Sequence, residues 1–591
     1  MASSSSLVSS SPSPATAPPA VIPSIVRGTK IVQLIEKPLS HLIEDCAIRF
    51  DDRSAVNVPW QKVDLSYRTL AERSRMMAKV LLWAGLKHGD VVGIMGGNRY
   101  EYIETFLAAG RIGCPVVLMN NMFTPAELEH AMGRVSVSVL VIAGLIGPRN
   151  MEEHIKSVLA RADGPKHVVV LGNENKNWGS DRAHTYSGFF NEANSKATDV
   201  ELEAAESRVV VNDILNLQFT SGTTGRPKAA CLTHRNILND AMFVGAAMKL
   251  TPADVVSCPP PLFHCFGLVM GFLASFYHGS SIVFPSDTFN AEMTIESVLR
   301  DRISALLGVP TMFFAQLELL EKHKGRWAPF KTVRTGLAAG SQVPAPLMES
   351  IFKQMNIPSM LIAYGMTETS PVTFITAIED NKDKRFNTIG RVLPHTDAKV
   401  VDSRGRILPI GQRGEICTAG FPLQRGYWND EEKTCEVMQE DEHGVRWMYT
   451  GDEGYLDADG YGYVTGRIKD LIIRGGENIS PSEIEGRLLE HPLIGESCVV
   501  GLDDKKYGEA VAAFLKASDQ AKGSRPSDAE LRQWVSQTLG RHKAPKHVFW
   551  VGDQGVGKDL IKTASGKYQK HLMRALGNGL LKQSDPVAAK L

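Results

Sequence analysis

The sequence has no net charge, no long hydrophobic run and no paired cysteine motif, and each absence excludes a class of protein. Its 65 lysines and arginines balance 65 aspartates and glutamates, so no overall field draws it to nucleic acid or an anionic membrane. No apolar run reaches the ~18–20 residues that a membrane span requires. The longest, Leu268 to Tyr277, ends at His278-Gly279 and favours a core element.

The eight cysteines are scattered, and none forms a CxxC pair or stands at metal-ligand spacing from a histidine. This usage favours free thiols in a reducing compartment. His264 and Cys265 are neighbours in the chain. Their side chains should therefore point in different directions, which makes a poor metal or nucleophile pair.

The chain begins with a short tail of biased composition, and the rest has the composition of an ordinary globular protein. Hydrophobic residues make up 43% and charged residues 22% of the 591 residues, which suits several folded cores. Residues 1–24 are rich in serine, proline and alanine and carry no charged side chain, so we expect a disordered tail. The tail lacks the charged start and long apolar stretch of a secretory signal.

Helical patterns alternate with short apolar strands from residue 25 onward, which predicts α/β layers with mostly parallel sheet. A boundary is expected near Gly466–Asp470, after a turn-rich stretch. We therefore predict a large domain over 25–468 and a small domain over 469–591. Helices are expected over 70–84 and 100–110, and strands over 91–95, 116–118, 139–142, 168–171 and 214–219.

The most informative segment is LQFTSGTTGRPKAACLTH, from Leu217 to His234. Its glycines let backbone N–H groups approach an anion, its hydroxyls donate hydrogen bonds and its lysine adds a positive charge. The glycine spacing does not fit a Walker A loop. We predict a phosphate-binding loop delivered by a buried strand, with these candidate residues: Thr220, Ser221, Gly222, Thr223, Thr224, Gly225 and Lys228.

This segment resembles the phosphate loop of the adenylate-forming superfamily, which includes acyl-CoA synthetases, luciferases and peptide-synthetase adenylation domains. Five further segments resemble the superfamily in its order, over about residues 215–570. PPPLFHCFGLVMG (259–271) places His264 where an aromatic residue or histidine lines the carboxylate pocket. GLAAGSQVP (336–344) looks like the small-residue loop along adenine, with Ala339, Gly340 and Ser341 as candidates.

AYGMTETSPV (363–372) resembles the motif that binds adenine and magnesium. The resemblance implies that Tyr364 stacks on adenine beside Gly365, that Thr367 contacts phosphate and that Glu368 holds Mg²⁺. A carboxylate suits this hard cation.

YTGDEGY (449–455) places Asp452 on the ribose hydroxyls, and a carboxylate has the two oxygens that a vicinal diol can use. Arg467 in GRIKD would approach ribose and phosphate. KTASGK (562–567) carries Lys567, the implied catalytic lysine.

The resemblance implies the fold, the reaction and its cofactors. ATP and a carboxylate would give acyl-adenylate and pyrophosphate with Mg²⁺, and CoA would then displace AMP. The large domain would hold layered α/β subdomains, and the small α+β domain would be mobile and rotate at Lys469 between the steps. Rotation would remove Lys567 and bring in Gly475 and Gly476 beside the pantetheine arm.

Among family members, the chain looks most like fungal acyl-CoA ligases and medium-chain acyl-CoA synthetases. Luciferases and peptide-synthetase domains are alternatives, but no carrier domain follows Lys567 and no early pocket aspartate is evident. We therefore expect a neutral, apolar, medium-chain carboxylic acid. Its pocket candidates are Phe263, Phe266, Met312 and Leu337.

Two other substrate and function classes stay open. One is a short hydroxylated or branched acid, mevalonate-like, in a fungal secondary-metabolite or siderophore pathway. The other is a non-catalytic scaffold relative. Finally, the chain ends in Ala589-Lys590-Leu591, a variant of the Ser-Lys-Leu peroxisomal address, which predicts a peroxisomal import receptor as partner, with a cytoplasmic location as the alternative.

Overall fold

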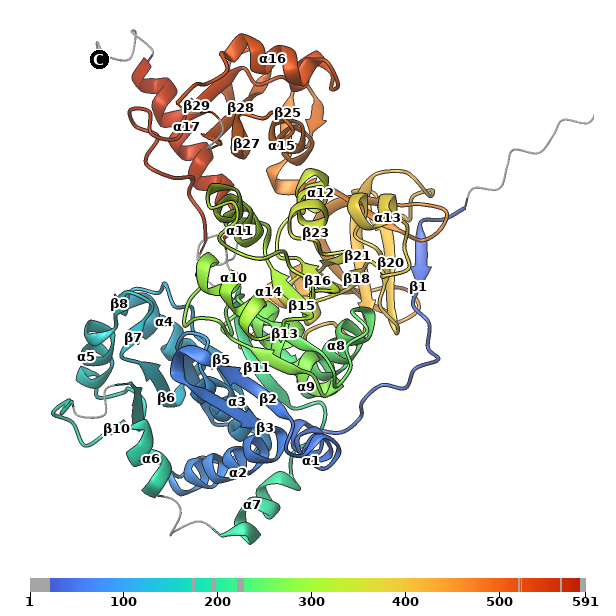
Figure 1. The fold of residues 1–591 in the computed structure, drawn as a ribbon. Coiled ribbons are helices and arrows are strands. Elements are labelled where there is room, and N and C mark those ends of the chain that lie inside the picture. Colours follow the sequence, from blue (N-terminus) through green and yellow to red (C-terminus); the bar gives the residue numbers. More distant parts are fainter. Residues whose placement is uncertain are drawn as a thin grey trace, which may run out of the picture.

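The computed structural model describes residues 22–172, 176–192, 198–220, 228–518, 521, 523–563 and 566–584. Three large sheets and their helices form one large domain, and a fourth sheet forms a small domain at the C-terminal end (Figure 1). The predicted fold class is confirmed: a mixed α/β chain with a large N-terminal and a small C-terminal domain. The predicted tail lies mostly outside the described residues.

The first sheet has seven strands in the order β10-β9-β6-β4-β5-β11-β12. Adjacent strands in this sheet run parallel, except that β12 pairs antiparallel with β11. Because parallel strands are covered on both faces, β4 and β5 are buried throughout. The strands are β4 (Val91–Met95), β5 (Val116–Leu118), β6 (Val137–Ala143), β9 (His167–Leu171), β10 (Ala183–Thr185), β11 (Ile214–Thr220) and β12 (Lys228–Thr233).

The second sheet has nine strands in the order β19-β18-β17-β16-β15-β13-β14-β2-β3, parallel from β17 to β2 and antiparallel at both edges. The strands are β2 (Ser54–Val58), β3 (Val63–Ser66), β13 (Val255–Ser257), β14 (Ser281–Val283), β15 (Ala305–Gly308), β16 (Thr335–Ala338), β17 (Ser359–Tyr364), β18 (Phe374–Ile375) and β19 (Arg391–Val392).

One continuous hydrophobic core joins these two sheets. Helices α3 (Tyr100–Arg111) and α8 (His234–Ala247) are buried on nearly all sides, as a helix between layers must be. The other helices of the large domain are α1 (Leu39–Phe50), α2 (Tyr67–Trp83), α4 (Pro125–Val135), α5 (Glu152–Ala160), α6 (Tyr186–Glu192), α7 (Asp199–Glu206), α9 (Ala274–His278), α10 (Ala291–Arg300), α11 (Pro310–Lys322), α12 (Ala345–Gln354), α13 (Lys382–Asn387) and α14 (Glu431–Val437).

The third sheet is antiparallel and follows the order β1-β20-β21-β23-β22, with β24 on β23. It brings the start of the chain, β1, beside residues far along the sequence (Figure 1). Its strands are β1 (Ile25–Arg27), β20 (Thr396–Val401), β21 (Gly414–Gly420), β22 (Met438–Glu440), β23 (Arg446–Leu456) and β24 (Gly462–Arg467); a small hairpin elsewhere joins β7 (Leu145–Ile146) and β8 (Arg149–Asn150).

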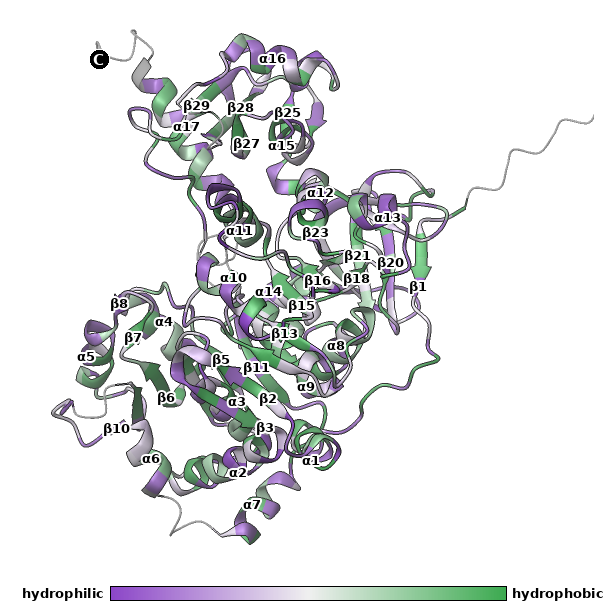
Figure 2. Cartoon of the chain, viewed as in Figure 1, coloured by the Kyte–Doolittle hydropathy of each residue, from purple (hydrophilic) through white to green (hydrophobic). Residues whose placement is uncertain are grey.

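The small domain begins after a short turn, η5 (Ile468–Asp470), and its sheet has one hydrophobic cluster on each face. Figure 2 shows hydrophobic residues along its strands and hydrophilic ones along the outer helix α16. The elements are β25 (Ile472–Arg474), β26 (Glu477–Ile479), α15 (Pro481–Leu489), β27 (Ile494–Asp504), β28 (Gly508–Ala517), α16 (Asp528–Ser536), β29 (His547–Trp550) and α17 (Lys570–Ser584).

The individual elements expected from the sequence are confirmed. The helices expected over 70–84 and 100–110 are α2 and α3, and the five expected strands are β4, β5, β6, β9 and β11. The apolar stretch from Leu268 to Tyr277 forms π-helical turns, η3 (Phe266–Leu273), followed by α9. Within the described ranges, no helix is both long and apolar enough to cross a bilayer.

Candidate active site

The predicted phosphate loop joins two paired strands. Strands β11 and β12 are antiparallel, and the last pair in their register joins Thr220 to Lys228. The Thr220 hydroxyl donates to the Lys228 carbonyl at 3.5 Å. Five of the predicted loop residues lie outside the described residues, so their part in phosphate binding stays a prediction: Ser221, Gly222, Thr223, Thr224 and Gly225.

Lys228 and Glu368 both contact the same tyrosine, which the sequence analysis did not identify. The Lys228 ammonium lies 4.7 Å from the centre of the Tyr427 ring. The Tyr427 hydroxyl donates to Glu368 Oε1 at 2.8 Å. Tyr427 lies here because it forms an antiparallel bridge with Ala230 on β12. No local sequence pattern predicts this long-range pairing.

Glu368 is a fitting ligand for one magnesium ion. Its side chain sits in the turn η4 (Thr367–Thr369), it is 8% exposed, and its Oε2 has no hydrogen bond to a described residue. In the described ranges, no group of three or more His, Cys, Asp and Glu side chains gathers as a metal site. Magnesium held with nucleotide phosphates needs only one or two carboxylates.

Tyr364, Asp452 and Arg467 form a second polar group. The Tyr364 hydroxyl donates to Asp452 Oδ2 at 2.7 Å, and Arg467 Nε lies 2.9 Å from Asp452 Oδ1. The register of β23 and β24 places Asp452 opposite Arg467. Burial, followed by the Asp452 charge, raises the pKa of Tyr364 well above its usual value, so the hydroxyl remains a donor. Both oxygens of the proposed ribose carboxylate are thus held in place.

The backbone requires glycine at two of the candidate positions. Gly340 follows β16 with φ +92°, a conformation that favours glycine. A Cβ at Gly365 would lie 2.0 Å from the Pro371 carbonyl oxygen. Of the other candidates beside Gly340, Ala339 is buried and Ser341 is exposed.

His264 and Lys567 line the same small cavity, which has a volume of about 10 Å³. Such a volume is close to that of one water molecule. Burial, followed by the Lys567 charge, lowers the pKa of His264 to about 3, so the imidazole is neutral near pH 7. Burial and the nearby Arg467 lower the pKa of Lys567. The other lining residues are Pro260, Pro261, Phe266, Val309 and Gly340.

The lysine loop of the small domain is docked on the large domain. Gly566 has φ +81°, and a Cβ there would lie 2.5 Å from Thr311 Oγ1. The loop closes through hydrogen bonds between Thr563 and Lys567: the Thr563 N–H donates to the Lys567 carbonyl at 2.7 Å, and the Lys567 N–H donates to Thr563 Oγ1 at 3.1 Å. A bulkier residue at Gly566 would push this loop off α11.

Gly475 and Gly476 form the exposed tip of the β25–β26 hairpin. Their φ values are +62° and +87°, which a two-residue turn of this kind requires. They do not line the cavity that contains Lys567. Lys469, the predicted hinge, lies in η5 between the third and fourth sheets.

The apolar candidates for the acid pocket are brought together only in part. All four are buried, but of these only Phe266 lines the cavity beside Lys567: Phe263, Phe266, Met312 and Leu337. A buried carboxyl missed from the sequence, that of Asp240 on α8, lies close to this region. Its Oδ2 accepts from the Val372 N–H at 3.1 Å, and its Oδ1 has no partner in the described structure.

Comparison with known protein families accounts for this arrangement. A model described as AMP-binding enzyme matches residues 43–428. A second, described as AMP-binding enzyme C-terminal domain, matches residues 483–567.

Relatives match along nearly the whole length. The acyl-CoA ligase sidI of Aspergillus fumigatus is 41% identical over 95% of this chain and 94% of its own. The mitochondrial medium-chain acyl-CoA ligase ACSF2 of Danio rerio is 33% identical over 94% of this chain and 91% of its own.

Solved structures agree on the fold. An anthranilate CoA ligase, AuaEII, solved with anthranoyl-AMP, has a TM-score of 0.80 at 22% identity, with 93% of this chain and 99% of that chain covered. ATP-bound MatB from Rhodopseudomonas palustris has a TM-score of 0.77 at 25% identity, with 92% and 99% covered.

Proposed function

Because this chain belongs to the AMP-binding enzyme family and is an AMP-forming acid–CoA ligase, we propose that it activates a neutral, mainly apolar carboxylic acid of medium length. The observation that carries this proposal is that Lys567, the neutral His264 and the apolar Phe266 and Val309 meet around one small cavity, which marks where the carboxylate end of the acid would lie. One cation at the edge of apolar walls suits a substrate with one carboxylate and no other charge.

In the proposed first half-reaction, a carboxylate oxygen attacks the α-phosphorus of ATP and pyrophosphate leaves. Both partners are anionic, so fixed positive groups lower the barrier by offsetting charge as it builds up. Lys567 would contact the reacting oxygens, and Lys228 would approach the leaving phosphates. Magnesium, bound near Glu368, would neutralise phosphate charge.

Nucleotide binding would use the second polar group. Asp452, held by Tyr364 and Arg467, would accept from both ribose hydroxyls. Tyr364 would lie against adenine, opposite the chain at Ala339, Gly340 and Ser341. Thr367, at the start of η4, would contact phosphate.

In the proposed second half-reaction, the CoA sulfur attacks the acyl carbon and AMP leaves. We propose that the small domain turns at Lys469 between the two steps. The described arrangement suits the first step because Lys567 lines the cavity while Gly475 and Gly476 are exposed away from it. The turn would exchange these two segments.

A short hydroxylated or branched acid is the second candidate substrate, and Asp240 favours it. Burial raises the pKa of Asp240 well above its usual value, which favours the protonated carboxyl. Burial, followed by the Asp240 charge, raises the pKa of Cys265, which places Asp240 near the residue after His264. A protonated carboxyl with a free oxygen can bond to a substrate hydroxyl.

A panel of carboxylic acids, assayed for pyrophosphate release with and without CoA, tests the function. We expect the highest kcat/KM with an unbranched aliphatic acid of medium length. Faster turnover of an amino acid or a dicarboxylate would overturn the proposal. A mevalonate-like acid as the best substrate would select the second candidate.

We also propose a peroxisomal location and recognition of Ala589-Lys590-Leu591 by the import receptor. These residues lie outside the described ones, and their sequence alone supports the proposal. A tagged protein with a free C-terminus should appear in punctate organelles. A diffuse cytosolic signal would support the cytoplasmic alternative.

A further inference from the structure

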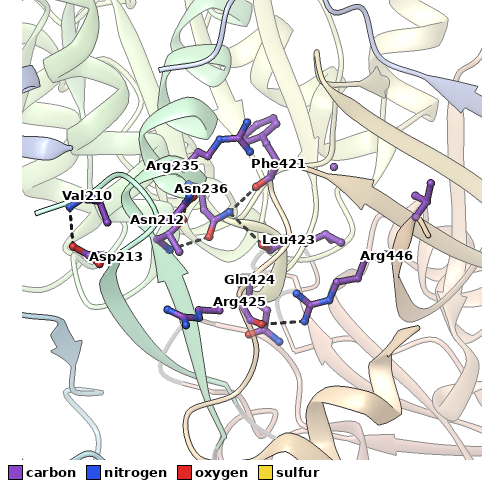
Figure 3. A pocket seen from close by; sticks show the side chains of 13 residues that line it. Val210, Asn212, Asp213, Arg235, Asn236, Phe421, Leu423, Gln424, Arg425 and Arg446 are labelled. Carbon is purple, nitrogen blue, oxygen red and sulfur yellow. Dashed lines mark hydrogen bonds between the residues drawn. The ribbon is translucent and has the colours of Figure 1, made fainter. Parts of the chain in front are cut away.

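A pocket of about 700 Å³ lies away from the proposed active site. It opens where β11 begins and β12 ends, whereas Thr220 and Lys228 lie at the other end of these strands. Six residues of strand span roughly 20 Å. The main volume of the pocket therefore lies away from the proposed phosphate loop, and only Gln424 on its wall comes near Tyr427 and Glu368. Figure 3 shows the lining side chains, which come from 210–213, 233–236, 420–425 and 445–446.

The charges around the pocket favour an anion. Three arginines face one acidic residue, Asp213, which already accepts from the Val210 N–H at 2.8 Å and pairs with His88 at 2.9 Å. Arg235 is held by Glu36 through contacts of 2.9 to 3.1 Å. The guanidinium groups of the other two arginines therefore determine which ligands the pocket attracts.

Arg425 and Arg446 are these two groups. The Arg425 side chain is exposed and has no hydrogen bond or ion pair with a described residue. Arg446 uses one Nη2 bond, at 3.0 Å, to the Arg425 carbonyl, which brings it onto the same segment (Figure 3). The guanidinium fork matches the oxygens of phosphate and carboxylate groups, so these two side chains can hold an oxyanion.

Gln424 adds a buried polar side chain that can still form hydrogen bonds. Its side chain lines the pocket, is fully buried, and neither its Nε2 nor its Oε1 has a hydrogen-bond partner in the described structure. The amide lies near the Tyr427 hydroxyl without making a hydrogen bond of normal geometry. Leaving such a group unpaired is unfavourable, and a polar ligand would supply the missing hydrogen bond.

The remaining walls define the size and character of the ligand. The volume lies in the usual range for pockets that hold small organic molecules, about 300–1,000 Å³. It is much larger than inorganic phosphate needs. Apolar surface comes from Val210, Phe421, Leu423 and Val445, so the ligand has an organic part as well as its charge.

We propose that this pocket binds a small organic oxyanion, either a phosphate ester or a carboxylate. Arg425 and Arg446 bind the charged oxygens, and Gln424 bonds to a polar group on the buried side. The pocket touches the active site through the chain itself, because the Gln424 N–H donates to the Glu368 carbonyl at 2.9 Å.

Calorimetric titration of the full-length protein tests the proposal. The nucleotide cleft is first saturated with a non-hydrolysable acyl-adenylate analogue. Glucose 6-phosphate, citrate and glucose are then titrated as a phosphate ester, a carboxylate and a neutral control. We expect saturable binding of at least one anion, no binding of glucose, and an affinity that falls as salt rises.

Variants locate the binding to the pocket. The Arg425→Ala/Arg446→Ala double variant should weaken anion binding at least tenfold and keep basal ligase activity within about twofold. Arg413→Ala removes an exposed arginine elsewhere and should change neither. Leu423→Trp places a larger ring on the pocket wall and should also weaken binding.

Three results would overturn the proposal. One is an absence of binding by both anions up to millimolar concentration. Another is equal affinity in the wild type and the double arginine variant, which would place the anion elsewhere. The third is unchanged binding in Leu423→Trp. Thermal unfolding of each variant shows whether it is folded before it is titrated.

Discussion

Lys567 of the small domain and His264 of the large domain line one cavity, and the lysine charge helps to keep the imidazole neutral. Neither residue can reach the other without docking of the loop around Gly566 on Thr311. In this state the two residues lie together, as the proposed adenylation step requires.

Replacing Lys567 by alanine should separate the two half-reactions. Removing one charge-stabilising donor from such a site typically costs ~10²–10³-fold in rate, so pyrophosphate release should fall by at least that factor. Conversion of pre-made acyl-adenylate to acyl-CoA should stay within a few-fold of wild type. Lys558→Ala, an exposed lysine near the same loop, is the control and should change neither rate. Equal loss of both steps would show that Lys567 is structural or needed throughout.

The pH dependence of adenylation should report Lys567. The cationic form is the active one, and burial and Arg467 lower its pKa below the usual value of about 10.4. The cationic fraction declines as pH rises through that lowered pKa, so kcat/KM for pyrophosphate release should fall at a lower pH than an ordinary lysine would cause. Lys567→Arg should move this limb upward. An alkaline limb that is the same in both proteins would belong to another group.

Tyr364→Phe should weaken nucleotide binding through Asp452. The variant keeps the ring but removes the 2.7 Å hydrogen bond to Asp452 Oδ2. A hydrogen bond to a charged group contributes about 1.5–3 kcal/mol, so KM for ATP should rise roughly tenfold or more. KM for the acid should change little. Tyr455→Phe, on the same strand as Asp452, is the control. A rise in both KM values would indicate a general disturbance of the site.

The sequence predicted most of the fold and much of the candidate site, for identifiable reasons. Strands such as β4 and β11 are continuous apolar runs, so their burial in a parallel sheet can be read locally. Lys567 and Glu368 stand in short segments with distinctive composition. Asp452 could be proposed for the same reason, although no local sequence pattern predicts its hydrogen bond to Tyr364.

What the sequence could not predict depends on contacts between distant segments. Tyr427 meets Glu368 because the chain after β21 pairs with β12. Asp240 faces the Val372 N–H across two packed elements, and within α8 it looks like an ordinary polar residue. Gln424 and the arginine pocket arise where four separate segments converge. No spacing of residues along the sequence predicts these contacts.

Asp240 should discriminate between the two candidate substrate classes. If a hydroxylated acid is the substrate, Asp240→Leu should raise its KM at least tenfold, because the hydroxyl loses its partner. The KM for an unsubstituted aliphatic acid should stay the same or fall. Asp240→Asn replaces the carboxyl with an amide that can still bond to the hydroxyl, so it should retain most of the preference. Parallel changes for both acids in Asp240→Leu would assign Asp240 a packing role beside Val372.

Lys469→Pro should impair thioester formation more than adenylation. Lys469 lies in η5, between the last strand of the large domain and the first strand of the small one. Proline fixes φ near −65° and stiffens the segment that we propose turns between the two steps. Pyrophosphate release, which suits the docked arrangement, should stay within about tenfold of wild type. Conversion of pre-made acyl-adenylate should fall by a larger factor. Lys469→Ala removes the same side chain without fixing the backbone, so it should keep both half-reactions. Single-turnover assays of each half-reaction in the three proteins give the comparison. If Lys469→Pro converted acyl-adenylate as fast as Lys469→Ala did, the small domain would not turn at this residue.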